Sequence, residues 1–296
     1  MAYENLDYAV RDRVAEITMR RAPVNAIDHG LIEDINNAYR EAKADAGVRA
    51  VILTSAFENS FSAGMDLAMI RGKRGLDLRR YLEKLYFEMH DLQYRMGKPT
   101  IAALSGPARA AGVTLAVSCD CIVAGETASL GYPEIVVGVI PAMHFVHLPR
   151  QIGRHKAFEL LFSGKPVSAA EACAMGLVNR VVPKAKVMDE ARAIARDFAQ
   201  KSPLVMQLAR DSFMRANDFE YRRATRTWSR RSATSSRPTM PRKASPPSTR
   251  SAGRTGEAAR RRRASPPTTQ LGWRIQSAWY GAMHPATSDD QPCLTL

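Results

Sequence analysis

Short apolar runs alternate along this chain with longer segments whose apolar residues recur at helical spacing, and this alternation limits the folds it can adopt. The runs at 50–54, 100–104 and 121–124 have the length and composition of strands buried on both faces of a sheet. A β-branched segment at 14–19 predicts a further strand. Strands that alternate with helices favour a largely parallel sheet with crossover helices, so we predict an α/β fold.

The segments between these runs predict amphipathic helices. Apolar residues recur at helical spacing from Leu31 to Tyr39, after Asp28, which we expect to be the N-cap. A longer helix is predicted over 78–96, where leucines and methionines step by four and three residues until Gly97 stops it. Later helices are predicted over 110–118, 154–163, 168–175, 187–199 and from Leu204 to Phe213.

The formal net charge of +14 is concentrated at one end of the chain. Residues 222–296 hold 15 lysines and arginines and three acidic residues, a net charge of +12, so the preceding 221 residues carry only +2. A protein that binds nucleic acid or an anionic surface would therefore act through this basic tail, with Trp273, Trp279 and Tyr280 as stacking residues. We keep that role as an alternative and expect no nucleic-acid partner for the body of the protein.

Composition divides the chain into three parts: a core over 1–200, the start of a C-terminal helical region over 201–221, and the basic tail over 222–296. The tail is rich in Ser, Pro and Arg and lacks a periodic apolar face. It is either intrinsically disordered or translated in a shifted frame of a GC-rich gene. We favour the shifted frame because residues 202–209 begin an ordinary helical hairpin that the chain does not finish.

Cysteine spacing and hydropathy predict a cytoplasmic protein. The four cysteines form no pair or Cys/His spacing typical of a zinc site, so we expect reduced thiols and no metal. No apolar run approaches the roughly 20 residues that cross a bilayer, and the first ten residues lack the features of a signal peptide. We therefore expect no membrane association.

Two turns rich in small residues, each between a strand and a helix, are the segments best suited to chemistry. The first covers 61–67 and the second covers 106–112. A helix N-terminus presents unpaired N–H groups, which can hold an oxygen that gains negative charge. Each turn alone is a common packing device, but two such turns can supply one N–H group each to the same oxygen.

In order along the chain, these turns and the segments after them resemble the crotonase (enoyl-CoA hydratase/isomerase) superfamily. The turns, about 45 residues apart, resemble that family's two oxyanion-hole turns. The resemblance covers about Ala9 to Asn217 and implies a crotonase-like ββα superhelix whose C-terminal helical region is truncated or replaced. Further matching segments are 115–120, 128–131, 133–135, 138–141, 168–172, 176–179 and 182–183.

The resemblance implies an acyl-CoA substrate whose thioester carbonyl is held by the N–H groups of Met65 and Ala111, which would stabilise an enolate. Coenzyme A is then part of the substrate, and no separate cofactor is expected. A homotrimer or hexamer is expected for the family, but the altered C-terminus argues against it here and leaves a folded, inactive remnant as an alternative. Further substrate contacts are implied for Arg21 and Ala26, which resemble part of the adenine site, and for Ala63, Gly64 and Asp66.

The resemblance also implies that Glu134 is the acid/base residue. Family members that hydrate a double bond usually carry two glutamates, but Thr114 stands at the first of these positions, and its hydroxyl cannot act as a general base near neutral pH. One shuttling carboxylate favours moving a double bond between the 3 and 2 positions of an enoyl-CoA. One alternative is decarboxylation or carbon–carbon hydrolysis, for which Thr114 and His144 could be the adapted residues. The other alternative is that Glu134 has only a structural role, as a cap or in a salt bridge at a loop.

Four polar residues near these segments are also candidates for the site, each with an alternative structural role. His144 and His147 would lie on the same side of a helix, without further metal ligands nearby. His144 either faces the acyl pocket as a second polar group or packs in the core, and His147 is expected to pack or form a hydrogen bond. Tyr132 either lines the pocket or fills the core, while Arg109 either contacts a CoA phosphate or lies in solvent.

Overall fold

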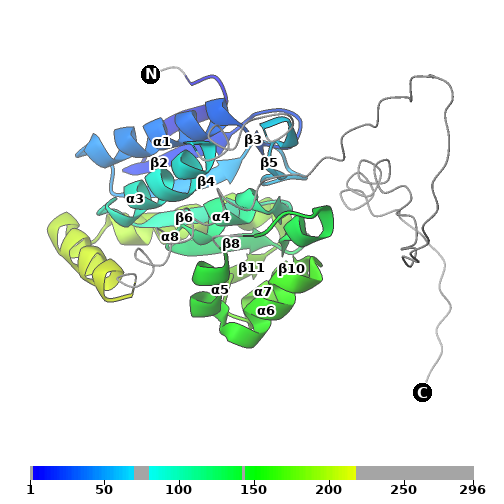
Figure 1. Cartoon of the computed structure of the whole chain (residues 1–296). Coiled ribbons are helices and arrows are strands. Elements are labelled where there is room, and N and C mark those ends of the chain that lie inside the picture. The colour runs from blue at the N-terminus through cyan, green and yellow to red at the C-terminus, as the bar shows by residue number, and fades with distance from the viewer. Residues whose placement is uncertain (1–2, 70–79, 142–143, 218–296) are drawn as a thin grey trace, which may run out of the picture. The chain divides into compact units, whose positions relative to one another are not determined.

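The computed structural model describes residues 3–69, 80–141 and 144–217 (Figure 1). The predictions for the basic tail at 222–296, including its aromatic residues and its role in nucleic-acid binding, lie outside the described residues. The predicted helix over 78–96 also begins outside them, because its description starts at Arg80.

A six-stranded sheet forms the centre of the fold, in the order β1-β2-β4-β6-β8-β11. The antiparallel pair β1 and β2 forms one edge, and every other neighbouring pair is parallel, which confirms the predicted largely parallel sheet. The three strands predicted from apolar runs and the one predicted from the β-branched segment are all present. The bounds are β1 Leu6–Arg11, β2 Val14–Met19, β4 Ala50–Ser55, β6 Thr100–Leu104, β8 Cys121–Gly125 and β11 Arg180–Val182.

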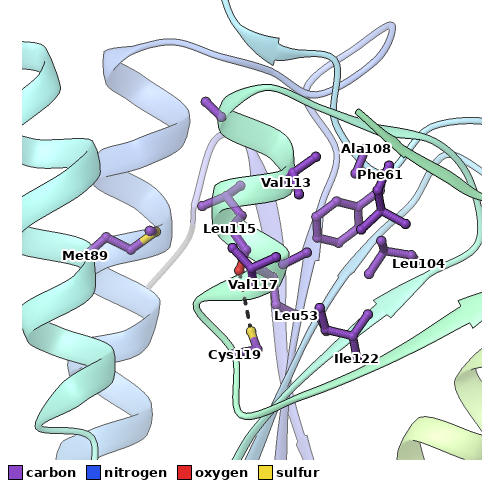
Figure 2. Packing of buried hydrophobic residues seen from close by; sticks show 14 of the residues in the cluster. Leu53, Phe61, Met89, Leu104, Ala108, Val113, Leu115, Val117, Cys119 and Ile122 are labelled. Carbon is purple, nitrogen blue, oxygen red and sulfur yellow. Dashed lines mark hydrogen bonds between the residues drawn. The ribbon is translucent and has the colours of Figure 1, made fainter. Parts of the chain in front are cut away.

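Both faces of this sheet are covered, because alternate residues of its strands point to opposite sides. Leu53 belongs to the larger core, together with residues of α1 (His29–Ala44) and α4 (Ala111–Val117). Ile52 belongs to the smaller core, against α8 (Val187–Ala199). Figure 2 shows the larger core, where the apolar side chains of α4 pack against strand residues. The central strands β4, β6 and β8 are therefore largely apolar on both faces.

Local signals set the ends of several helices. The Asp28 carboxylate accepts a hydrogen bond from the Leu31 N–H at 2.8 Å, so α1 begins as predicted. A capping box between Ser168 and Glu171 begins α7 (Ala169–Ala174). The remaining helical segments are α5 His144–Ile152, α6 Arg154–Ser163, a helix from residue 203 to 217, and the short turns η1 Leu67–Met69, η3 Pro133–Val137 and η4 Lys184–Lys186.

The helix around residue 85 does not bury the row of leucines and methionines in the way that the sequence predicted. It contains a π-helical turn, η2 (Glu83–Glu88), before α3 (Met89–Tyr94). A π turn takes up more residues than an α turn, so the buried face rotates along the helix. As a result Gln93, 2% exposed, is buried in place of the predicted Leu92, which is only half-buried.

Two small sheets lie where the chain leaves the main sheet. In the first, β3 (Ala26–Ile27) pairs with β5 (Gly64–Met65) in parallel. The second joins β7 (Ala108–Arg109), β9 (Ser129–Gly131) and β10 (Val167–Ser168). The two turns singled out in the sequence therefore belong to ordered sheet segments.

The helix over 203–217 is attached to the core by one buried arginine. Arg210, 7% exposed, donates to both carboxylate oxygens of Asp120 at 2.9 and 3.0 Å and to the Gln93 carbonyl at 2.7 Å. The apolar stripe of this helix faces outward, with Leu204 and Phe213 at 64% and 63% exposed. The buried Arg210, rather than the apolar side chains of this helix, therefore joins it to the described core.

Among the described residues, none of the helices is both long and apolar enough to cross a membrane. The thiols of Cys119, Cys121 and Cys173 are free. The same part of the chain contains no group of three or more His, Cys, Asp or Glu side chains placed to hold a metal ion.

We expect Arg210→Met to lower the free energy of unfolding by about 3–5 kcal/mol, because it leaves the Asp120 carboxylate without its buried counter-charge. Urea denaturation of the full chain measures this change. Lys201→Met is the control, since Lys201 pairs with Asp197 while both side chains are more than half exposed, and such pairs contribute about 1 kcal/mol or less. Equal losses in the two variants would contradict this role of Arg210.

Candidate active site

The two turns rich in small residues are in direct contact. The Arg109 N–H donates to the Ser62 carbonyl at 3.0 Å. A Cβ atom added to Gly64 would lie 2.7 Å from the Arg109 carbonyl oxygen, and one added to Gly112 would lie 2.6 Å from the Ser62 carbonyl oxygen. Neither position has room for a side chain. The small residues therefore allow the two backbones to meet.

This contact brings the backbones around Met65 and Ala111 together. Ala111 is the first residue of α4, where N–H groups have no partner within the helix. Its nitrogen lies 3.4 Å from the Cβ position at Gly64, the residue before Met65. The Asp66 N–H donates to the Ile27 carbonyl of β3 at 2.9 Å. Because successive amides of a strand alternate in direction, the Met65 N–H is directed away from β3.

Glu134 lies in η3, between Pro133 and Ile135. Its backbone is fixed by the Val139 N–H, which donates to the Glu134 carbonyl at 2.8 Å. The residue as a whole is only half-buried, but its Oε2 atom is fully buried and has no hydrogen-bond partner among the described residues. This desolvation raises the pKa of the Glu134 carboxyl to about 7. Such a carboxyl can both accept and deliver a proton near neutral pH.

Thr114, Tyr132 and His144 meet in one cluster. The Thr114 hydroxyl lies 3.1 Å from Nε2 of His144, and both side chains are at most 1% exposed. The ring of Tyr132, two residues before Glu134, lies 4.2 Å from the His144 ring, centroid to centroid. His144 therefore connects α4 with the segment that carries Glu134.

Tyr86 is a member of this cluster that the sequence did not reveal. Burial raises the pKa of its phenol, and the nearby Glu134 carboxylate raises it further. Its phenol also lies near Thr114, and its ring lies 6.4 Å from that of His144. Tyr86 lies in η2, outside the predicted apolar stripe, so helical periodicity gave no signal for it.

Two further histidines lie beside His144. The His147 Nε2 is 3.0 Å from the Gln151 side-chain nitrogen, so the hydrogen bond predicted for His147 is present. His90, which sequence reasoning missed, lies 5.5 Å from His147, ring to ring. Burial lowers the pKa of His90 to about 3 and that of His147 to about 4. Burial also lowers the pKa of His144, so the imidazole is neutral near pH 7.

Arg21, Ala26 and Asp66 also come together. The Arg21 guanidinium donates to the Ala26 carbonyl at 2.8 Å and to the Asp66 carboxylate at 2.9 Å, and it pairs with Asp28 at 3.0 Å. Two carboxylates therefore neutralise Arg21, which holds β3 and β5 together. A phosphate would have to compete with these partners.

Arg109 is held by hydrogen bonds within the protein. Its guanidinium donates to the carbonyl and the hydroxyl oxygen of Ser129 at 2.9 and 2.8 Å, and burial lowers its pKa. The guanidinium is held against β9, so Arg109 does not lie free in solvent. Contact with a CoA phosphate stays a prediction.

Comparison with known proteins gives a consistent result. The family model described as enoyl-CoA hydratase/isomerase matches residues 10–243. A putative enoyl-CoA hydratase of Thermus thermophilus is 41% identical over 177 residues, which is 59% of this chain and 69% of the relative. A probable enoyl-CoA hydratase of Bacillus subtilis is 35% identical over 200 residues, which is 67% of this chain and 77% of the relative.

Solved structures agree with these sequence matches. The crystal structure of an enoyl-CoA hydratase/isomerase from Xanthobacter autotrophicus Py2 superposes with a TM-score of 0.71 at 32% sequence identity. The superposition covers 79% of this chain and 86% of that chain. The described fold is therefore the crotonase fold predicted from the sequence.

We expect Gly112→Ala to lower the free energy of unfolding by about 1–3 kcal/mol, because the added methyl group must push the two turns apart. Gly47→Ala is the control, since its Cβ would approach only the Asp45 side chain, at 3.1 Å, and should change stability by less than about 0.5 kcal/mol. Thermal and urea unfolding measure both. A Gly112→Ala variant as stable as the control would show that the turns are not in close contact.

Proposed function

The chain belongs to the enoyl-CoA hydratase/isomerase family, and from this premise we propose that it isomerises an enoyl-CoA through a thioester enolate, with Glu134 as its one shuttling carboxylate. The observation that carries this proposal is the Oε2 atom of Glu134, which is buried without a partner among the described residues. Desolvation brings its pKa to about 7, within reach of both proton transfers. Coenzyme A enters as part of the substrate.

The proposed reaction begins with the proton on C2 of a 3-enoyl-CoA. The Glu134 carboxylate takes this proton, and the electron pair of the C–H bond moves toward the thioester to form an enolate. The N–H groups of Met65 and Ala111 hold the enolate oxygen. This role is supported by the contact between their two turns. Glu134 then returns the proton to C4, which gives the 2-enoyl-CoA.

Thr114 is the reason for preferring isomerisation. A second carboxylate at this position would activate water, but the hydroxyl of Thr114 stands there instead and forms a hydrogen bond with His144. A threonine hydroxyl alone is not a general base near neutral pH. A single carboxylate that takes and returns one proton needs no such base.

The cluster of Thr114 and His144 also favours a second candidate function. Decarboxylation, or hydrolysis of a carbon–carbon bond in an acyl-CoA or a diketone, proceeds through the same kind of enolate and needs a further polar group near the acyl chain. The buried hydrogen bond between these two residues supplies one. Mass spectrometry of the products separates these reactions, because isomerisation leaves the mass unchanged whereas the other two release a fragment.

We expect kcat/KM for isomerisation to rise with pH through about 7. Glu134 must be ionised to take the C2 proton, and its pKa is raised to about 7 by burial. Initial rates between pH 5 and pH 9 measure this dependence. A profile that is flat between pH 5 and pH 8 would contradict a base with this pKa.

We expect Glu134→Gln to lower isomerisation by about 10²–10⁴-fold, because the amide keeps the shape of the side chain but cannot carry the proton. The exposed Glu126 provides the control, and Glu126→Gln should retain wild-type activity. A carboxyl whose pKa is raised by folding loses stability as pH rises from about 4.5 to about 7. The Glu134→Gln variant should therefore melt at least as high as the wild type at pH 8, which separates lost chemistry from lost folding.

A further inference from the structure

A small cavity lies at the end of the main sheet opposite to the two turns of the candidate active site. It measures about 190 Å³ and lies between the hairpin that joins β1 to β2 and the helix α8. β2 begins at this end with Val14, which pairs with the first residue of β4, whereas the turn over 61–67 comes after the end of β4. The lining residues are Arg11, Asp12, Val14, Glu16, Arg192 and Arg196. None of them belongs to the candidate active site.

Two of the charged lining residues neutralise each other. Glu16, 7% exposed, accepts hydrogen bonds from the Arg192 guanidinium on both carboxylate oxygens, at 2.7 and 2.9 Å. These hydrogen bonds lower the pKa of the Glu16 carboxyl, so it is ionised near neutral pH. Such a bidentate pair joins β2 to α8 and leaves no net charge of its own.

The other two arginines of the lining have no such partner. The guanidinium groups of Arg11 and Arg196 form no hydrogen bond or ion pair within the described part of the chain, and both residues are exposed. Arg196 lies one turn after Arg192, so both side chains point to the same side of α8. The remaining charged residue of the lining is Asp12, at the tip of the hairpin. Three arginines against two carboxylates leave one positive charge at the cavity.

Packing and helix electrostatics do not account for this pair of arginines. Attraction to the C-terminal end of α8 favours Arg196 where it is, but it gives no reason for the approach of Arg11 from β1. Two guanidinium groups that line one cavity repel each other. An anion placed between them would replace this repulsion with attraction to both.

We propose that this cavity binds one phosphate-type oxyanion, either inorganic phosphate or the phosphoryl group of a small phosphate ester. A guanidinium presents its N–H donors in a planar fork that suits the oxygens of a phosphate or a carboxylate. The terminal oxygens of one phosphate can accept from two forks that come from different elements, whereas a carboxylate has only two oxygens to share between them. The volume of about 190 Å³ is below the roughly 300–1,000 Å³ of sites for drug-sized ligands. The cavity therefore suits one small anionic group rather than a whole cofactor.

Isothermal titration calorimetry of the full chain with inorganic phosphate tests the proposal, at low ionic strength because salt screens exposed charges. We expect Arg11→Gln and Arg196→Gln each to weaken phosphate binding by about tenfold or more, since each loses charge-assisted hydrogen bonds. The control is Arg215→Gln, because Arg215 is exposed and lies outside the cavity, and it should bind as the wild type does. All these proteins keep the basic residues 222–296, so differences between them report on the cavity.

Asp12→Asn gives a test in the opposite direction. Its carboxylate repels an anion in the cavity, so its removal should tighten phosphate binding several-fold. Asp12 has a φ of 50°, a conformation that asparagine also adopts readily, so the hairpin should keep its shape. A loss of folding could weaken binding but could not tighten it.

Glycerol 3-phosphate and acetate complete the experiment. An ester that binds at least as tightly as inorganic phosphate would identify a phosphate ester as the ligand, and weaker binding of the ester would identify the free anion. The proposal would be overturned by the absence of saturable phosphate binding to the wild type, or by equal affinities in the wild type and both cavity arginine variants. Acetate binding as tight as that of phosphate, or weaker phosphate binding by Asp12→Asn, would also overturn it.

Discussion

The approach of two backbone turns to within contact distance is the constraint on which the rest of the structure depends. Gly64 and Gly112 each lie where a side chain would strike the opposite turn. The sheet strands β4 and β6 deliver these turns to the same place, because parallel neighbours end at the same edge of a sheet. The apolar packing of α4 against that sheet then holds the second turn in position (Figure 2). The close positions of Met65 and Ala111 follow from this arrangement.

Burial then determines the charges around that contact. One carboxylate oxygen of Glu134 has no partner in the described part of the chain, and the pKa of this carboxyl is raised, while His144 is held neutral beside Thr114. The cationic side chains of Arg21 and Arg109 differ from these groups, because both guanidinium groups form hydrogen bonds with other residues of the protein. The buried polar groups of the candidate site therefore include a carboxyl with a pKa of about 7 and an uncharged hydroxyl–imidazole pair.

Features set by local sequence could be predicted, whereas those set by long-range contacts could not. The strands and the Asp28 cap of α1 follow from apolar periodicity and one side-chain hydrogen bond, which neighbouring residues fix. The π turn that carries Tyr86 and the burial of Gln93 depend on how one helix meets its neighbours. The attachment of Arg210 to Asp120 joins residues 90 positions apart, and no local pattern signals it. In the candidate site, Glu134 was predicted by family resemblance, but the burial of its Oε2 atom is a property of the folded protein.

Exchange of the C2 hydrogen of a saturated acyl-CoA with solvent deuterium tests the central claim most directly, because it requires only the enolate and its base. Proton NMR of butyryl-CoA incubated with the full chain in deuterated water follows this exchange without any net reaction. The account predicts exchange by the wild type and a rate at least about 10²-fold lower for Glu134→Gln. Equal exchange rates for the two proteins, or no exchange by a wild type that binds butyryl-CoA, would contradict it.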